Sequence, residues 1–296
     1  MNITDPILPT GQWIFTHDLA KCADGTAKGA VALAKRAGCR GLLVKWSDGG
    51  SLYAAGGARS LIEACKAAQL DVIPWGYVYP GDAENVARLV AGALQVTGQK
   101  LFVLDAETEF DTSPPEAAEQ LLTAVRGVGA RPLYTSLPWP STQPQFPWSV
   151  FQQHAEGYLP QLYPWDLAGG TEAPSAEWVG RCWRQGTAEW AKLEPARPTV
   201  PIGAVRGGRI GQQAGTAVDA GFPTLAWWVL DGLTQEQADW LAETPFATRP
   251  AQSPAAAPVT APGADVALAQ ANAQLGAYKA AVEGLIFDLK GRGLVK

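Results

Sequence analysis

Three carboxylates follow one short apolar run, which makes this stretch the first candidate for chemistry. Residues 101–110 read LFVLDAETEF, so Asp105, Glu107 and Glu109 stand at every second position. Side chains alternate along a strand, so Val103, Asp105 and Glu107 would share one face. Two carboxyl groups on one face can provide a proton donor and an anion, which hydrolysis of a glycosidic bond requires.

The same spacing leaves the stereochemistry of such a reaction open. Two alpha carbons that are two residues apart along a strand are separated by about 6.6 Å. Side-chain rotamers then allow both the short carboxyl separation of retaining enzymes and the longer one of inverting enzymes. Glu109 and Asp111 come later, and we expect them on a solvated loop.

Eight apolar runs alternate with helical patterns and would position these acids. The runs cover residues 12–18, 41–48, 71–80, 101–110, 131–139, 158–166, 199–206 and 224–232. Helical spacing of apolar residues is clear in residues 25–38, 59–70 and 83–96. This count and length predict an α/β protein with a (β/α)8 TIM barrel over residues 1–247. An open doubly wound sheet would need a glycine-rich loop after the first run, where THDLAKCADG stands instead.

Helix starts support this division of the chain. Ser113 followed by Pro114, Pro115 and Glu116 predicts an N-cap, a first turn with prolines and a capping-box acid. Thr234 and Gln237 repeat the spacing of a capping box.

The active site of such a barrel forms where its strands end, and acids and aromatic residues dominate those positions here. Tryptophan and tyrosine rings offer flat apolar surfaces on which sugar rings stack. The 12 tryptophans include Trp178, Trp183, Trp190 and Trp240, which fall within helical patterns and should pack onto the barrel. The candidate substrate-binding residues are Lys45, Trp46, Trp75, Tyr77, Tyr79, Tyr134, Gln161, Tyr163, Trp227 or its neighbour Trp228, and Asp231.

The order of several motifs resembles the lysozyme-type glycoside hydrolase family 25, whose barrel cleaves peptidoglycan. The matching segments, between residues 12 and 136, are LLVKWSDG, WGYVYPGDAENVARLV, FVLDAETEF and PLYTS. The resemblance implies that Glu107 of the D-x-E motif is the general acid, with Asp105 as its partner, and that Asp18 matches an aspartate on the first strand. Leu-Ala follows Asp18 where that family favours Val-Ser, and LPQLYPWD replaces a W-x-A-x-Y pattern. PQLY is similar to a motif of other glycosidase-like barrels, many of them phage-encoded.

Each candidate also has a structural interpretation. Asp105 and Glu107 could form a buried polar network with Lys45. Asp18, Asp166 and Asp231 could cap helices or lie on solvated loops. His17 and His154 have no nucleophile motif near them and would be ordinary structural residues. The GGRIG segment at 207–211 could bind phosphate or simply permit a tight backbone.

Two functions from different classes therefore remain open. The first is a glycoside hydrolase that acts on peptidoglycan or a related cell-surface polysaccharide. The second is a non-catalytic glycan-binding or structural barrel within a larger assembly such as a phage tail. A polysaccharide is the expected partner in both cases, as substrate or as ligand.

Composition excludes other classes of function. A net charge of −5 and a pI near 5.2 argue against nucleic-acid binding, since no basic face is visible. Four scattered cysteines without a CxxC and two histidines give no metal-ligand spacing, so neither a metal nor a cofactor is expected. No signal peptide or membrane span is evident, which predicts synthesis in the cytoplasm, followed by association with a virion or release to act on the cell wall.

The end of the chain differs in composition from the barrel. Residues 248–264 are rich in proline and alanine, which predicts a linker. In residues 265–296, apolar residues recur at helical spacing and predict a C-terminal amphipathic helix. A single amphipathic helix cannot bury its own apolar stripe, so we expect it to dock on a second copy or another partner protein. Folding back onto the barrel is the alternative.

Overall fold

The structure, a computed structural model, describes residues 2–169 and 174–247. The predicted linker and C-terminal helix, residues 248–296, lie outside the described residues. Among the residues that are described, no helix is both long enough and apolar enough to cross a membrane.

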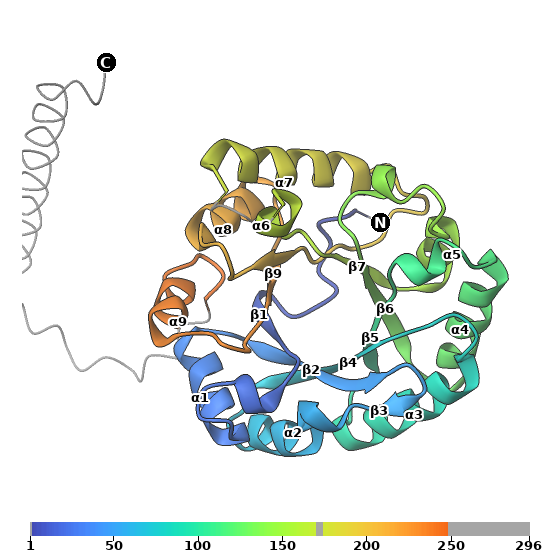
Figure 1. Cartoon of the computed structure of the whole chain (residues 1–296), viewed down its shortest axis with the longest axis horizontal. Coiled ribbons are helices and arrows are strands. Elements are labelled where there is room, and N and C mark those ends of the chain that lie inside the picture. The colour runs from blue at the N-terminus through green and yellow to red at the C-terminus, as the bar shows by residue number, and fades with distance from the viewer. Residues whose placement is uncertain (1, 170–173, 248–296) are drawn as a thin grey trace, which may run out of the picture. The chain divides into compact units, whose positions relative to one another are not determined.

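Parallel strands form a nearly closed barrel, as the sequence predicted (Figure 1). The strands are β1 (Gly11–Thr16), β2 (Gly41–Asp48), β4 (Asp71–Tyr77), β5 (Leu101–Asp105), β6 (Arg131–Ser136), β7 (Gly157–Pro160), β8 (Ile202–Ala204) and β9 (Thr224–Trp228). Hydrogen bonds join them in the order β7-β6-β5-β4-β2-β1-β9-β8. Two isolated parallel bridges, Tyr158 to Thr199 and Gln161 to Ile202, connect the β7 and β8 ends. The (β/α)8 fold is therefore confirmed.

One short strand was not predicted. Strand β3 (Ser51–Leu52) pairs antiparallel with the end of β2, through Ser47–Leu52 and Asp48–Ser51. Gly49 makes this tight turn possible because it adopts a φ of +53°, which favours glycine. The resulting hairpin extends one wall of the barrel mouth.

Helices surround the strands (Figure 1). They are α1 (Ala27–Arg36), α2 (Ala58–Ala67), α3 (Ala83–Thr97), α4 (Pro115–Gly127), α5 (Trp148–His154), α6 (Pro164–Leu167), α7 (Ala176–Trp190), α8 (Ile210–Asp219) and α9 (Gln235–Ala242). Thr234 and Gln237 form the predicted capping box of α9. The N-cap predicted at Ser113 is wrong by one residue: Pro114 takes that position, and the Ser113 hydroxyl donates to the Glu109 carbonyl instead.

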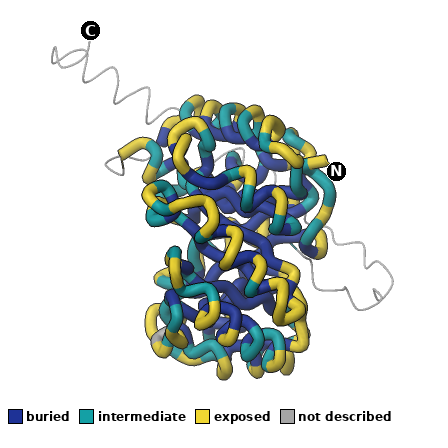
Figure 2. Tube along the Cα trace, turned by 90° about the vertical axis from the view of Figure 1, so that its right-hand side faces the viewer, coloured by how far each residue is buried: buried dark blue, intermediate teal, exposed yellow. Residues whose placement is uncertain are grey.

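Two apolar layers result from the alternation of side chains along the strands. The barrel interior is filled by residues such as Trp13, Phe15, Leu43, Ile73, Trp75, Val103, Leu133, Leu159 and Ala226. The neighbouring strand residues, among them Ile14, Leu42, Val44, Phe102, Leu104 and Leu225, pack against the helices instead. Figure 2 shows the buried segments inside and the exposed ones on the outer surface. On β5, Val103 points inward, so Asp105 is the next side chain on the interior side.

Candidate functional site

A cavity of about 240 Å³ opens where the barrel strands end. Its walls come from six of the barrel's strands or the residues directly after them, and they are His17, Lys45, Trp75, Tyr77, Asp105, Glu107, Gln161, Tyr163 and Trp228. Typical pockets for drug-sized ligands have volumes of about 300–1,000 Å³. This smaller cavity therefore suits one ring of a longer molecule rather than a whole large ligand.

Gln161 connects the two predicted acids. Its Nε2 atom donates hydrogen bonds to Asp105 Oδ1 at 2.9 Å and to Glu107 Oε1 at 2.7 Å. Both hydrogens of one amide are thus used on two carboxyl groups. The two bonded oxygens can be no farther apart than these two hydrogen bonds laid end to end. The two carboxyl groups are therefore close neighbours in the cavity.

The Asp105 carboxyl is buried, with 7% of the residue exposed, whereas Glu107 is only partly buried. Burial, followed by the negative charge of Glu107, raises the pKa of Asp105 well above its usual value, and Lys45 offsets part of this effect. A hydrogen bond between the two carboxyl groups raises the pKa of Asp105 further. Asp105 therefore keeps a proton where a solvated aspartate is ionised. The sequence-based hypothesis had made Asp105 the anion of the pair.

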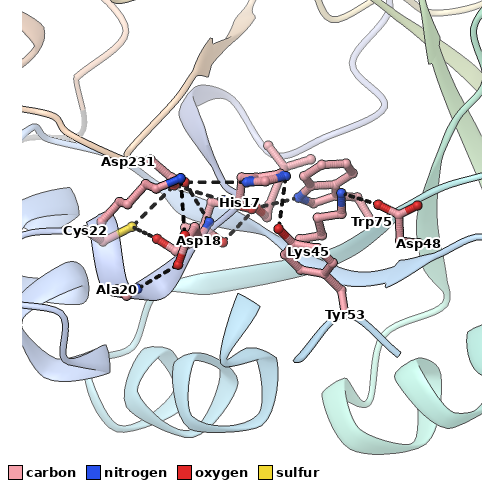
Figure 3. Close-up of polar contacts among 12 residues, drawn as sticks. His17, Asp18, Ala20, Cys22, Lys45, Asp48, Tyr53, Trp75 and Asp231 are labelled. Atoms are coloured by element: carbon pink, nitrogen blue, oxygen red, sulfur yellow. Dashed lines mark hydrogen bonds and ion pairs between the residues drawn. The ribbon is translucent and has the colours of Figure 1, made fainter. Parts of the chain in front are cut away.

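Lys45 does not serve as the counter-ion of the acidic pair. Its Nζ atom lies 2.8 Å from Asp48 Oδ2, and the side chain is only 4% exposed. The ammonium group also lies 4.2 Å from the ring centroid of Tyr53 and 5.0 Å from that of Trp75 (Figure 3). Asp48 and two aromatic faces thus compensate the buried charge. The hydrogen bonds of the acidic pair come from Gln161 instead.

Asp231 holds the end of β1 in place. Its carboxylate accepts the backbone N–H of His17 at 2.9 Å and that of Asp18 at 2.6 Å. This arrangement aims the His17 ring into the cavity, where Nε2 lies 3.3 Å from the Tyr53 hydroxyl (Figure 3). Burial and the charge of Lys45 lower the pKa of His17, which favours a neutral imidazole. Asp231 therefore supports the cavity without lining it.

Asp18 lies outside the cavity lining. Its side chain caps the 3-10 helix Leu19–Lys21 by accepting the Ala20 N–H at 3.0 Å, and it pairs with Lys21 at 3.3 Å. The sequence had offered this capping role as the alternative to a catalytic one. His17, one residue earlier, is the residue from this strand end that reaches the cavity.

Aromatic rings form much of the cavity wall. The Trp228 ring lies 5.8 Å from Trp75 at a steep angle and 6.3 Å from Tyr163 in a stacked arrangement. Trp75 is fixed by a hydrogen bond from its Nε1 to the Thr16 carbonyl. The Tyr77 hydroxyl donates to Glu109 Oε2 at 2.8 Å, and burial together with this bond raises the pKa of Tyr77. These rings offer flat faces to a bound sugar.

Besides Asp231, four predicted binding residues do not line the cavity. Trp46, Tyr134 and Trp227 point toward the helix layer, where Leu89, Gln152 and Gln12 are their respective hydrogen-bond partners. Tyr79 lies at the rim, 39% exposed, with its hydroxyl 3.3 Å from Asp48 Oδ1. Adjacent strand residues point to opposite faces of the barrel wall. Because Lys45 and Trp228 point into the cavity, their neighbours Trp46 and Trp227 point away from it.

Sequence reasoning missed His17, Tyr53 and the choice of Trp228 over Trp227. A usable signal existed for two of them. His17 has the same parity as the interior residue Phe15, and Trp228 has the same parity as the interior residue Ala226. Tyr53 lies beyond the unpredicted hairpin, where no strand pattern could place it. Within residues 2–169 and 174–247, no group of three or more His, Cys, Asp or Glu side chains could hold a metal ion.

No protein family model and no curated protein matches the chain. Solved structures do resemble it. One is the spore cortex-lytic enzyme SleL of Bacillus megaterium QM B1551, with a TM-score of 0.55 and 10% identity over 81% of this chain and 78% of that one. Another is a class V chitinase from Pseudomonas fluorescens Pf-5, with a TM-score of 0.56 and 8% identity over 78% of this chain and 100% of that one.

At such low identities these likenesses establish the fold alone. The chain is a (β/α)8 barrel with an acidic pair in an aromatic-walled cavity at the carboxyl ends of its strands. The resemblance to glycoside hydrolase family 25 remains a prediction, because no family model matches.

Proposed function

We propose that this chain is a glycoside hydrolase that acts on peptidoglycan or a related cell-surface polysaccharide. One observation carries the proposal: the buried Asp105, with its raised pKa, lies in a hydrogen-bonded pair with Glu107 inside an aromatic-walled cavity. A proton held on Asp105 can stabilise, through the hydrogen bond between the two carboxyl groups, the carboxylate that remains after Glu107 has protonated the leaving oxygen of a glycosidic bond.

Glu107 is the general acid in this proposal, because it is the less buried member of the pair. The proton passes from the Glu107 carboxyl group to the glycosidic oxygen as the bond between that oxygen and the sugar carbon breaks. Asp105 keeps its own proton and donates it in a hydrogen bond to the carboxylate that Glu107 becomes. Gln161 holds both groups in position throughout. General acid catalysis of this kind contributes about a hundred- to ten-thousand-fold to a rate.

The second half of the reaction needs a nucleophile on the opposite side of the sugar. Asp105 does not provide it in this proposal, because burial favours its protonated form and a protonated carboxyl group is a weak nucleophile. Most glycoside hydrolases place two carboxyl groups on either side of the bond, but some use a group of the substrate itself. We therefore propose that the acetamido carbonyl oxygen of an N-acetylated sugar bonds to the anomeric carbon of that sugar as the glycosidic bond breaks. Water then opens the resulting ring and returns a proton to Glu107. Peptidoglycan and chitin both contain such sugars.

The names of two fold neighbours support this direction. One is a spore cortex-lytic enzyme and the other a class V chitinase. The aromatic rings of Trp75, Tyr77, Tyr163 and Trp228 give the cavity the surfaces that sugar rings stack on. The second candidate is a non-catalytic glycan-binding barrel. It is favoured by the observation that Gln161 satisfies both carboxyl groups, as in a structural polar network.

An assay of the full chain on purified peptidoglycan and on chitin separates the two candidates. We expect new reducing ends from wild type, and a loss of about a hundred- to ten-thousand-fold in rate for Glu107→Gln. Glu119→Gln, an exposed change on α4, is the matched control and should keep wild-type activity. Equal cleavage by Glu107→Gln would refute its role. Binding to either polysaccharide without any cleavage would establish the non-catalytic candidate.

A further inference from the structure

A second groove, of about 390 Å³, adjoins the candidate active site. Residues 205–207, after β8, form one side of this groove, and residues between 228 and 233, at the end of β9, form the other. Trp228 lines both the groove and the cavity. A polysaccharide with one sugar in the cavity can therefore place a neighbouring substituent in the groove.

Arg206 is the cation of this groove. It is exposed, and it makes no hydrogen bond or ion pair with another described residue. Its guanidinium carbon lies 5.8 Å from the ring centroid of Trp165. The planar guanidinium group carries several donors in a fixed arrangement that fits both oxygens of a carboxylate. These donors are available to a ligand.

The backbone beside Arg206 is fixed by close packing. Gly207 has a φ of +82°, and a Cβ added there would lie 2.6 Å from the Trp165 ring. Only glycine lets the chain approach the indole this closely. Trp165 thus contacts both the backbone at Gly207 and the guanidinium group of Arg206.

The acid of the same groove does not neutralise Arg206. Asp231 is 9% exposed, and its carboxylate already accepts the backbone N–H groups of His17 and Asp18. The Cys22 thiol is a further donor to it, at 3.4 Å. Asp231 forms no ion pair with Arg206. The exposed charge that the groove offers to a ligand is therefore that of Arg206, whereas the negative charge of Asp231 is largely buried.

We infer that the groove recognises a carboxylate carried by the polysaccharide beside the sugar in the cavity, and that Arg206 is the residue that binds it. This inference rests on the proposed function and narrows the substrate class. Peptidoglycan bears carboxylates on its stem peptides and on any lactyl group that carries no peptide, whereas chitin bears none. A carboxylated glycan should therefore be preferred over a neutral one with the same N-acetylated backbone.

The test compares soluble peptidoglycan fragments that carry free carboxylates with chitin oligosaccharides of equal length. For Arg206→Ala, the ratio of kcat/KM between the charged and the neutral substrate should fall about ten- to a hundredfold, mainly through KM. Arg181→Ala is the matched control, because Arg181 also lies over a tryptophan, Trp178, but on α7. The control should keep the wild-type ratio. An unchanged ratio in Arg206→Ala would overturn the inference.

Binding measurements keep the inference testable if wild type cleaves neither substrate, which would refute the proposed function alone. N-acetylmuramic acid and N-acetylglucosamine are titrated into wild type and into Arg206→Ala by calorimetry. Tighter binding of the acid by wild type, lost in the variant and weakened by salt, supports the inference. Equal binding of the two sugars, no binding of the acid, or equally tight binding of acetate would overturn it.

Discussion

The carboxyl groups of Asp105 and Glu107 accept hydrogen bonds from a single nitrogen atom, Nε2 of Gln161. Gln161 directly follows β7, whereas Asp105 ends β5 and Glu107 follows it, so the bridge joins two strands that have β6 between them. The amide thus holds the two carboxyl groups close together, and the charge of Glu107 acts on the pKa of Asp105. The protonation of Asp105, the hydrogen bonds from Gln161 and the choice of substrate each lead to a prediction.

The first prediction concerns stability and pH. The pKa of Asp105 is raised in the folded chain, so between the unfolded pKa, near 3.9, and the folded pKa the native state binds more protons than the unfolded state. The free energy of unfolding must fall as the pH rises through that range. The asparagine of Asp105→Asn cannot ionise, so the free energy of unfolding of this variant should not fall for that reason. We expect urea unfolding to show the variant more stable than wild type at pH 7.

The two proteins should be nearly equally stable near pH 3.5, where the wild-type carboxyl group is protonated in both states. Asp219→Asn, on α8, is the control for a general charge effect. If Asp105→Asn loses stability at pH 7 relative to pH 3.5 as wild type does, Asp105 is not the group with the raised pKa.

The second prediction concerns the bridging amide. Gln161→Leu removes both hydrogen bonds and leaves two acids without their donor. An unsatisfied buried group costs about 1–3 kcal/mol, so the free energy of unfolding should fall by about that amount. The rate on polysaccharide should fall as well, because the acids lose their fixed orientation. Chemical denaturation and the reducing-end assay measure the two effects.

Gln185→Leu is the matched control for this change, because Gln185 also donates to a carboxylate, that of Glu189, but on α7. It should leave the rate at the wild-type level. Wild-type activity in Gln161→Leu would show that the bridge has no role in catalysis.

The fold was predictable because eight apolar runs alternate with amphipathic helices. The acids of the site were predictable for a related reason. After the apolar run of β5, acids stand at every second position, so that Val103, Asp105 and Glu107 lie on one face. On the other strands the sequence did not show which alternate residues face the interior. Strands of a parallel barrel are buried on both faces, so an apolar run does not show which residues face the interior. Trp46 and Trp227 were predicted to bind substrate, yet they face the helices.

Two further features depend on contacts that local sequence does not encode. The position of His17 at the cavity depends on Asp231, far along the chain, which accepts the backbone N–H groups of His17 and Asp18. The proton on Asp105 depends on its burial and on the charge of Glu107. Both effects arise only when distant strand ends meet at the barrel mouth.

The third prediction concerns the substrate. If the sugar provides its own acetamido carbonyl as nucleophile, a glycan without this group has no way to complete the reaction. Chitin oligosaccharides should be cleaved, and fully deacetylated oligosaccharides of the same length should be cleaved at least a hundredfold more slowly, given the contribution of an oriented intramolecular group. Product analysis by mass spectrometry measures both. Comparable rates on the two oligosaccharides would point to a protein or water nucleophile instead.

The fourth prediction uses Trp227 and Trp228, two adjacent residues of β9 whose side chains point to opposite faces of the strand. Trp228 lines the cavity, so Trp228→Ala should raise KM on polysaccharide about tenfold by removing a stacking surface. Trp227 is fully buried against the helices, where its Nε1 donates to Gln12 Oε1. Trp227→Ala should therefore lower the free energy of unfolding by about 3–5 kcal/mol.

Each variant is the control for the other, because both remove a tryptophan side chain and the two positions are adjacent. Chemical denaturation should show a larger loss of stability for Trp227→Ala than for Trp228→Ala, because Trp228 is only partly buried. Michaelis–Menten measurements on folded protein should show the reverse order for KM. If Trp227→Ala stays as stable as wild type while its KM rises, the alternation assigned here to β9 is wrong. Trp227, and not Trp228, would then be the tryptophan of β9 that lines the cavity.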